Sequence, residues 1–243
     1  MTVDIRHWKK FSDLAERAGD MLDGSGPDEV LSWAVETFGD RLCLTSSMAD
    51  AVLIDVASRV KPGIDVVFLD TGYHFPETLA TRQEVEDRYR IDLTVLQPEQ
   101  SVREQDAEFG AKLHDRDPDF CCWKRKVEPL QKGLEPYDAW MSGIRRDESA
   151  ARAHTRVVEW DENRGMVKVN PLANWTQAEV DAYIEEHDVV LNPLLDQGYP
   201  SIGCAPCTRK VKPGEDPRAG RWAGFGKTEC GLHLDSAPSE AAS

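Results

Sequence analysis

The 243-residue sequence lacks the long apolar segments that membrane proteins require. No apolar run reaches about 18 residues, so we expect no membrane span and no membrane partner. The N-terminal stretch MTVDIRHWKKFSDLAERAGD also lacks the apolar centre of a secretory signal. Both absences predict a protein that stays in the cytoplasm.

Positive charge is scarce, and it is unevenly distributed. The chain has 29 Lys and Arg against 44 Asp and Glu, a net charge of −15, which argues against nucleic acid as a non-specific partner. Segments 121–128, 143–156 and 204–230 nevertheless hold 13 Lys/Arg and 6 Asp/Glu, a net of +7. This local excess favours a site for a small anion. Chance clustering on solvated loops is the alternative.

Alternating helical and strand-like segments predict an α/β fold with a doubly wound, mostly parallel sheet. Apolar runs typical of buried strands occupy 41–45, 64–69 and 92–96. Helical periodicity predicts helices over 4–20, 27–38, 49–60 and 76–90. Beyond Pro98 we expect a helix over 119–128, a strand over 139–143, a hairpin over 157–169 and a helix over 175–187.

The chain divides into an α/β domain, 1–207, and a C-terminal segment, 208–243. From Gly198 onward Gly, Pro and Arg dominate the sequence. We therefore expect 208–229 to be an extended, mobile loop that carries a cysteine at its end. The final stretch DSAPSEAAS predicts a disordered terminus.

Six cysteines in a chain without a secretion signal favour metal or redox chemistry over a disulfide framework. Four of them form two close pairs, Cys121–Cys122 and Cys204-x-x-Cys207, which can supply four thiolates to one centre. The spacing leaves open a structural zinc and an iron–sulfur cluster, although a tandem pair is unusual for a zinc ribbon. Four unrelated buried thiols are the remaining alternative.

The other two cysteines have different surroundings. Cys43 lies in the apolar run RLCLTSS and is expected to be a small buried hydrophobic residue. Cys230 follows a glycine-rich stretch in GFGKTECGLH, with Lys227 and His233 close in sequence. Cationic neighbours lower the pKa of a thiol and favour a nucleophilic thiolate. An unpaired cysteine without a role is the alternative.

Two motifs follow predicted strands. LTSSMAD joins a strand to a helix, where amides of the helix N-terminus and the hydroxyls of Thr45, Ser46 and Ser47 would hold a phosphate. The motif lacks the glycines and the lysine of a Walker A loop, and an ordinary capped turn is the alternative. LDTGYHFPET begins at Leu69, at the carboxyl end of the next strand, the edge where open α/β sheets bind ligands.

Two further motifs are rich in arginine. SGIRRDESAAR places Arg145, Arg146 and Arg152 where their guanidinium groups could hold phosphate or sulfate. Surface ion pairs of these arginines with neighbouring carboxylates are the alternative. RAGRWAGFGKTECGLH places Arg218 and Arg221 ahead of the Cys230 thiol on a glycine-rich segment.

In this order, LTSSMAD, LDTGYHFPET, CCWKRKVEPL, GIRRDES, GCAPC and ECGLH resemble the assimilatory adenylylsulfate and phosphoadenylylsulfate reductases. The resemblance extends from about residue 40 to residue 233 and implies an adenine nucleotide alpha-hydrolase-like fold. It also implies thioredoxin-dependent reduction of adenosine 5′-phosphosulfate to sulfite and AMP in sulfate assimilation. In this scheme the Cys230 thiolate attacks the sulfate sulfur, AMP leaves, and a thioredoxin-type dithiol releases sulfite from the S-sulfocysteine.

The resemblance also implies the ligands of this site. Family members that have both cysteine pairs resemble 4Fe–4S enzymes that prefer adenylyl sulfate, so Cys121, Cys122, Cys204 and Cys207 are expected to hold one 4Fe–4S cluster. Lys126, one helical turn after Cys122, would link the cluster to the substrate sulfate. The expected substrate-binding residues are Thr45, Ser46, Ser47, Leu69, Thr71, Lys126, Gly143, Arg145, Arg152, Arg218, Arg221 and His233.

Three other functions compete with this interpretation. The 3′-phosphorylated substrate is the nearest alternative. A non-enzymatic, adenylate-binding metal-cluster sensor is the second, although it would not need a reactive Cys230. An ATP-dependent tRNA thiolase would need a glycine-rich pyrophosphate loop and a basic RNA face, and neither is evident in the sequence. The sequence leaves a homo-oligomer open.

Overall fold

The computed structural model describes residues 5–227 and 229–232, and a six-stranded sheet forms the centre of this part of the chain. The strand order is β3-β2-β1-β4-β6-β5. All neighbouring strands are parallel except β5, which runs antiparallel to β6 at the edge. The strands are β1 (Leu42–Ser46), β2 (Ile64–Leu69), β3 (Ile91–Leu96), β4 (Ala139–Met141), β5 (Val158–Asp161) and β6 (Met166–Val169). The mostly parallel, doubly wound sheet predicted from the sequence is therefore confirmed.

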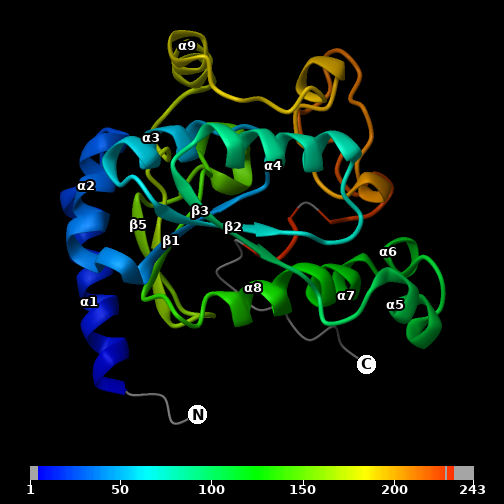
Figure 1. The fold of residues 1–243 in the computed structure, drawn as a ribbon, viewed down its shortest axis with the longest axis horizontal. Helices are drawn as coiled ribbons and strands as arrows, with labels where there is room; N and C mark the ends of the chain where they lie inside the picture. The colour runs from blue at the N-terminus through cyan, green and yellow to red at the C-terminus, as the bar shows by residue number, and fades with distance from the viewer. Residues whose placement is uncertain (1–4, 228, 233–243) are drawn as a thin grey trace.

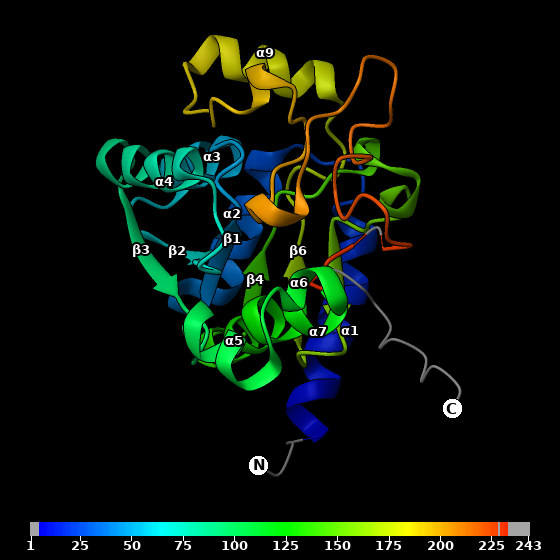
Figure 2. The same cartoon turned by 90° about the vertical axis from the view of Figure 1, so that its right-hand side faces the viewer.

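Helices cover both faces of this sheet (Figure 1). The α-helices are α1 (Ile5–Met21), α2 (Pro27–Phe38), α3 (Val52–Val60), α4 (Pro76–Arg88), α5 (Val102–Phe109), α6 (Leu113–Arg116), α7 (Pro118–Cys122), α8 (Glu128–Gly133) and α9 (Gln177–His187). In Figure 1, α3 and α4 lie above the strands and α8 lies below them. Figure 2, turned by 90°, shows the same two layers with the sheet between them. None of the described helices is both long and apolar enough to cross a membrane.

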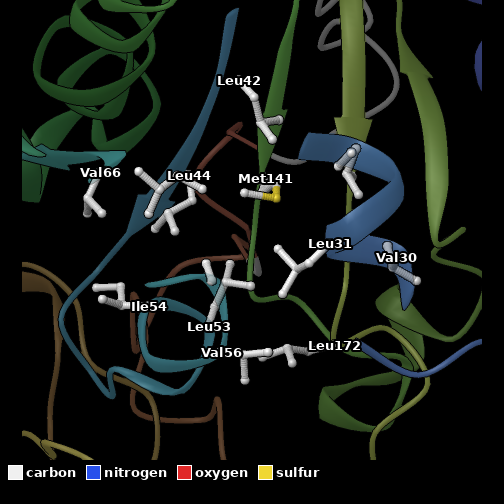
Figure 3. Close-up of a cluster of buried hydrophobic side chains, with 14 of the residues drawn as sticks. Val30, Leu31, Leu42, Leu44, Leu53, Ile54, Val56, Val66, Met141 and Leu172 are labelled. Atoms are coloured by element: carbon white, nitrogen blue, oxygen red, sulfur yellow. The ribbon is translucent and has the colours of Figure 1, made fainter. Parts of the chain in front are cut away.

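The alternation of side chains along the strands separates two hydrophobic clusters. Leu42 and Leu44 of β1 face the larger cluster with α1, α2 and α3, while Cys43 between them faces α8. This alternation is the period of two that a strand imposes. Figure 3 shows the larger cluster, in which Leu31 of α2 and Leu53 of α3 point toward β1. Cys43 is fully buried, as its apolar run predicts.

The expected hairpin over 157–169 is confirmed as the antiparallel pair β5–β6. Gly165 closes its turn with a positive φ of 67°, and its amide donates to the Asp161 carbonyl at 2.7 Å. A Cβ at Gly165 would lie 2.6 Å from the Trp8 ring. The turn therefore uses glycine both for its backbone conformation and for the close approach of α1.

The chain between β3 and β4 differs most from the prediction. The expected helix over 119–128 is present, but its α-helical hydrogen bonding is interrupted: α7 continues into a π-helix over Trp123–Val127, which continues into α8 at Glu128. Pro129 explains the interruption, because its ring excludes the carbonyl of Arg125 from an α-helical turn and it has no amide to donate. Cys121 and Cys122 lie in α7, directly before the π-helix.

The C-terminal segment is folded back on itself, and the expectation of an extended loop is wrong for its first half. Thr208 and Arg221 form an antiparallel bridge, and the Arg209 amide donates to the Gly220 carbonyl at 2.9 Å. Trp222 is buried, and its amide donates to the Cys207 carbonyl at 2.9 Å. We call residues 208–222 the C-terminal hairpin. The mobility of 208–229 stays a prediction, and His233 and the stretch 235–243 lie outside the described residues.

Candidate active site

The strand order creates a switch point between β1 and β4. From β1 the chain proceeds to β2 and β3 on one side, whereas β4 and its neighbours lie on the other. Loops that leave the carboxyl ends of β1 and β4 therefore diverge and leave a crevice, the usual ligand site of open α/β sheets. A cavity of about 720 Å³ opens there, and the C-terminal hairpin closes it from outside.

The cavity brings together the substrate-binding residues expected from the sequence, apart from His233, which lies outside the described residues. They come from four regions: the ends of β1 and β2, the loop after β4, the π-helix and the C-terminal hairpin. Lining residues from the expected set are Thr45, Ser46, Ser47, Leu69, Thr71, Lys126, Gly143, Arg145, Arg152, Arg218 and Arg221. Cys204 and Cys230 line it as well.

The hydroxyl groups after β1 have different partners. Thr45 donates to the Met141 carbonyl at 3.3 Å, and Ser46 accepts the Met48 amide at 3.1 Å. Asp50 accepts the Val52 amide at 3.1 Å, so a carboxylate already satisfies one amide at the start of α3. Ser47 is exposed at the cavity wall. Of the three hydroxyls, that of Ser47 is the most open to a ligand.

The arginines after β4 also divide into two groups. Arg146 is tied away from the cavity by hydrogen bonds to Asp23 and Asn174, both at 2.6 Å. Arg145 lines the cavity, with one guanidinium nitrogen on Gln177 at 2.6 Å, while its buried Nε has no partner among the described residues. Arg145 therefore has a donor to offer to a ligand, whereas Arg146 stabilises the fold.

Lys126 is a buried cation in the cavity wall. Its side chain extends from the π-helix, and its Nζ lies 5.9 Å from the centre of the Trp222 ring. Burial lowers the pKa of Lys126, but the neighbouring sulfur groups of Cys204, Cys230 and Cys122 more than offset this and raise the pKa above its ordinary value. Charge on these sulfur groups therefore favours the charged form of the lysine.

The two cysteine pairs lie near one another although the sequence separates them widely. Burial, and then the neighbouring thiols, raise the pKa of Cys121 to about 12 and that of Cys207 to about 11. The pKa of Cys122 is raised as well, mainly by burial. No three His, Cys, Asp or Glu side chains among the described residues are arranged to hold a single metal ion. The pKa shifts show that these thiols are neutral unless a positive group stabilises their charge.

Thr71 joins the cavity to the cysteines. Its side chain is fully buried, and its hydroxyl lies 3.3 Å from the Cys204 sulfur. Behind it, Arg125 of the π-helix donates to the Thr71 carbonyl and to the Gln105 side chain. The Thr71 hydroxyl therefore contacts the Cys204 sulfur, and the expected contact of Thr71 with the substrate stays a prediction.

The C-terminal hairpin places its arginines against small residues. Arg221 donates to the Ser201 hydroxyl at 3.2 Å and to the Ile202 carbonyl at 3.1 Å. A Cβ at Gly203 would lie 2.2 Å from the Arg221 guanidinium, so glycine gives this side chain its room. The guanidinium also covers the Trp222 ring at 4.6 Å.

Cys230 lies at the cavity between two anchored neighbours. Glu229, before it, accepts hydrogen bonds from Arg152 at 3.1 and 3.2 Å and lies 3.1 Å from Arg218. Leu232, after it, packs against the smaller core cluster. In Figure 1 the red C-terminal segment accordingly passes the tip of the β2 strand. Cys230 is partly exposed and lines the cavity.

Trp222, Glu229 and His74 are among the cavity residues that sequence reasoning missed. Trp222 has the cations of Lys126, Arg221 and Lys227 around its ring, at 5.9, 4.6 and 5.5 Å. Its position after Arg221 and before a glycine-rich stretch was the available signal. Burial lowers the pKa of His74. Glu229 lies in the ECGLH motif, but its pairing with the distant Arg152 had no signal in the sequence.

A doubly wound sheet whose switch point opens into a cavity lined by hydroxyls, cations and thiols defines a ligand-binding α/β protein. Residues 41–210 match the family model of the phosphoadenosine phosphosulfate reductase domain. A Streptomyces coelicolor protein named adenosine 5′-phosphosulfate reductase is 60% identical over 228 residues, which cover 94% of this chain and 97% of that protein. A Mycobacterium tuberculosis protein of the same name is 48% identical over 241 residues, covering 92% and 95%.

Two solved structures resemble this chain to different degrees. The crystal structure of the phosphoadenylyl-sulfate reductase from Candida auris in a phosphate complex has a TM-score of 0.71 and 35% identity, covering 81% of this chain and 96% of that one. The FMN adenylyltransferase of Candida glabrata, with a TM-score of 0.54 and 14% identity, shares the fold alone. The chain therefore belongs to the phosphoadenosine phosphosulfate reductase family.

Proposed function

We propose that this chain is an adenylylsulfate reductase, which converts adenosine 5′-phosphosulfate to sulfite and AMP in sulfate assimilation. The observation that carries the proposal is the position of Cys230, which lines the same cavity as the hydroxyls after β1 and the buried cation Lys126. The curated relatives from Streptomyces coelicolor and Mycobacterium tuberculosis bear the name of this activity. A cavity of about 720 Å³ suits a ligand of nucleotide size.

The first step forms a sulfur–sulfur bond. The Cys230 thiolate attacks the sulfur of the sulfate group, the bond from that sulfur to the phosphate oxygen breaks, and AMP leaves with the electron pair. Lys126 and Arg221 lie beside the cavity as cations for the phosphosulfate and for the thiolate. Cys230 then carries an S-sulfonate.

The second step releases sulfite by thiol–disulfide chemistry. One thiolate of a thioredoxin-type dithiol attacks the Cys230 sulfur, and sulfite leaves with the electrons of the broken sulfur–sulfur bond. The second thiol of the partner resolves the mixed disulfide and restores Cys230. The dithiol thus supplies both electrons. Free thiols and a dithiol reductant fit the reducing cytoplasm.

The cysteine quartet is proposed to hold one 4Fe–4S cluster. Three thiols of the quartet, those of Cys121, Cys122 and Cys207, have raised pKa values and fit a cationic iron centre, which would stabilise their charged forms. A cubane does not need the four side chains to converge on one ion, because each thiolate binds a different iron. When bound, the cluster would join the 204–207 loop to α7 and place charge opposite Lys126. The contact of the Thr71 hydroxyl with the Cys204 sulfur would then orient one of the cluster ligands.

Phosphoadenylyl sulfate is the second candidate substrate, favoured by the Candida auris relative, whose described activity uses it. Steady-state sulfite release with each nucleotide, with thioredoxin as reductant, tests both candidates. The proposal expects a higher kcat/KM for adenylyl sulfate. A preference for the 3′-phosphorylated nucleotide by about tenfold, or about 1.4 kcal/mol, would assign the second substrate instead. Sulfite from neither nucleotide would favour a binding protein.

A further inference from the structure

Glu229, the residue before the proposed nucleophile, has a largely buried carboxylate. This carboxylate takes no part in the two proposed reaction steps. Its carboxylate is held by the fork of Arg152 and by Arg218, at 3.1 to 3.2 Å. The exposed fractions of the three side chains are 9%, 13% and 17%. Charged hydrogen bonds in such a site are stronger than those of surface ion pairs, which water and salt weaken.

The two arginines line the cavity from different segments of the chain. Arg152 ends a 3-10 turn, Ala150–Arg152, in the loop after β4, and Arg218 belongs to the C-terminal hairpin. Arg152 is itself held by Glu148, and Arg218 by the Ser201 hydroxyl at 3.4 Å. Glu229 therefore docks onto positions that the rest of the fold has already fixed.

Four of the five described lysine and arginine side chains that line the cavity fall into two sets. Glu148 and Glu229 balance the charges of Arg152 and Arg218. Lys126 and Arg221 contact the Trp222 ring instead, and no carboxylate among the described residues forms an ion pair with either. This second set supplies two positive charges, which match the two negative charges of a phosphosulfate group. Lys126 and Arg221 can therefore balance the charge of the substrate while Glu229 stays paired with Arg152 and Arg218.

We propose that Glu229 is a positioning residue: its carboxylate docks on Arg152 and Arg218 as a latch that holds Cys230 at the cavity during attack on the sulfate. The inference rests on the proposed function, in which Cys230 is the nucleophile. Glu229 acts through its neighbour and touches no reacting atom. When these ion pairs break, the Cys230 sulfur can reach the dithiol partner. The contact is therefore formed during attack on the sulfate and broken during sulfite release.

The test compares Glu229→Gln with Glu215→Gln in the full-length, cluster-loaded protein. Gln keeps the size of the side chain and removes its charge. Glu215 is a matched control because it lies on the same segment and pairs with Arg209 at 2.9 Å, away from the cavity. Three quantities are measured: the iodoacetamide alkylation rate of Cys230, the Kd for AMP, and the single-turnover rate of S-sulfonate formation from adenylyl sulfate. Alkylation rates are compared at high pH, where the Cys230 thiol is fully ionised and the rate no longer depends on its pKa.

In Glu229→Gln, Cys230 should be alkylated about tenfold faster than in wild type, and S-sulfonate formation should be about tenfold slower. Each change corresponds to a loss of about 1.4 kcal/mol of docking free energy. The Kd for AMP should stay within about twofold of wild type, since AMP uses the other cations. Thioredoxin should discharge a preformed S-sulfonate at least as fast as in wild type. Glu215→Gln should change none of these quantities.

Two results would overturn the latch. Unchanged alkylation in Glu229→Gln would show that the carboxylate does not hold Cys230 in place. An AMP Kd lowered by about tenfold, with faster S-sulfonate formation, would show that Glu229 competes with the substrate for its arginines. Failure of the wild-type protein to form any S-sulfonate would instead overturn the proposed function, and the alkylation rates would still decide whether Glu229 holds Cys230.

Discussion

Glu229 and Arg152 form a two-bonded ion pair that joins the C-terminal segment to the loop after β4. The fork of one guanidinium matches the two oxygens of one carboxylate, which fixes direction as well as distance. Because Cys230 is the next residue, its position at the cavity depends on this contact. The sheet thus supplies the cavity, and a charge contact between distant parts of the chain lies directly beside Cys230.

Lys126 is the side chain whose replacement should harm the reaction most without harming the fold. Lys126→Gln should lower kcat/KM for adenylyl sulfate by about a hundredfold, because a buried cation beside Cys230 is lost where negative charge develops. Sulfite release under steady-state conditions measures this effect. Lys124→Gln is the matched control, since Lys124 lies in the same π-helix and pairs with Glu128 at 2.7 Å. A Lys126→Gln protein within about threefold of wild type would contradict the role.

The cysteine quartet should determine the metal content of the protein. Anaerobically purified wild-type protein should be brown and contain about four irons per chain. Cys121→Ala should lose iron and activity together, because the Cys121 thiolate would bind one iron and the cluster would join the 204–207 loop to α7. Cys43→Ala, at a buried cysteine on β1 outside the quartet, should keep its iron. A colourless, active protein with stoichiometric zinc would show that the centre is a zinc site.

Gly220 should prove necessary for the shape of the C-terminal hairpin. A Cβ there would lie 2.2 Å from the backbone oxygen of Arg209, which cannot move without breaking the hairpin pairing. Gly220→Ala should therefore raise the KM for adenylyl sulfate by about tenfold, since the hairpin carries Arg221. Gly226→Ala, where a Cβ meets open space, should leave the KM unchanged. Equal KM values for the two variants would contradict this account of the hairpin.

The sheet and most of its helices could be predicted because burial on both faces leaves continuous apolar runs such as IDVVFL. The residues after β1 and β2 meet at one edge because these strands are parallel. Arg152, Arg218 and Arg221 do not follow these runs and were expected from the resemblance to the reductases alone. α5 was missed although Ser101 and Glu104 form a capping box at its start. That signal was in the sequence and was not used.

The remaining differences arise from contacts between distant parts of the chain. The π-helix after Cys122 depends on Pro129 and on packing around Arg125, which periodicity alone does not reveal. The C-terminal hairpin has the glycine-rich composition of a loop, yet Trp222 fixes it to the cavity wall. Glu229 lies in the ECGLH motif, but its pairing with Arg152 could not be predicted, because 77 positions separate the two residues.

The central claim is that Cys230 becomes sulfonated, and mass spectrometry of the C-terminal peptide tests it most directly. Wild-type protein given one equivalent of adenylyl sulfate without reductant should gain one sulfonate group on Cys230, and thioredoxin should then release it as sulfite. Cys230→Ser should keep its iron and bind AMP but gain no sulfonate and release no sulfite. A sulfonate on Cys43 or on a quartet cysteine, or turnover by Cys230→Ser, would contradict the mechanism.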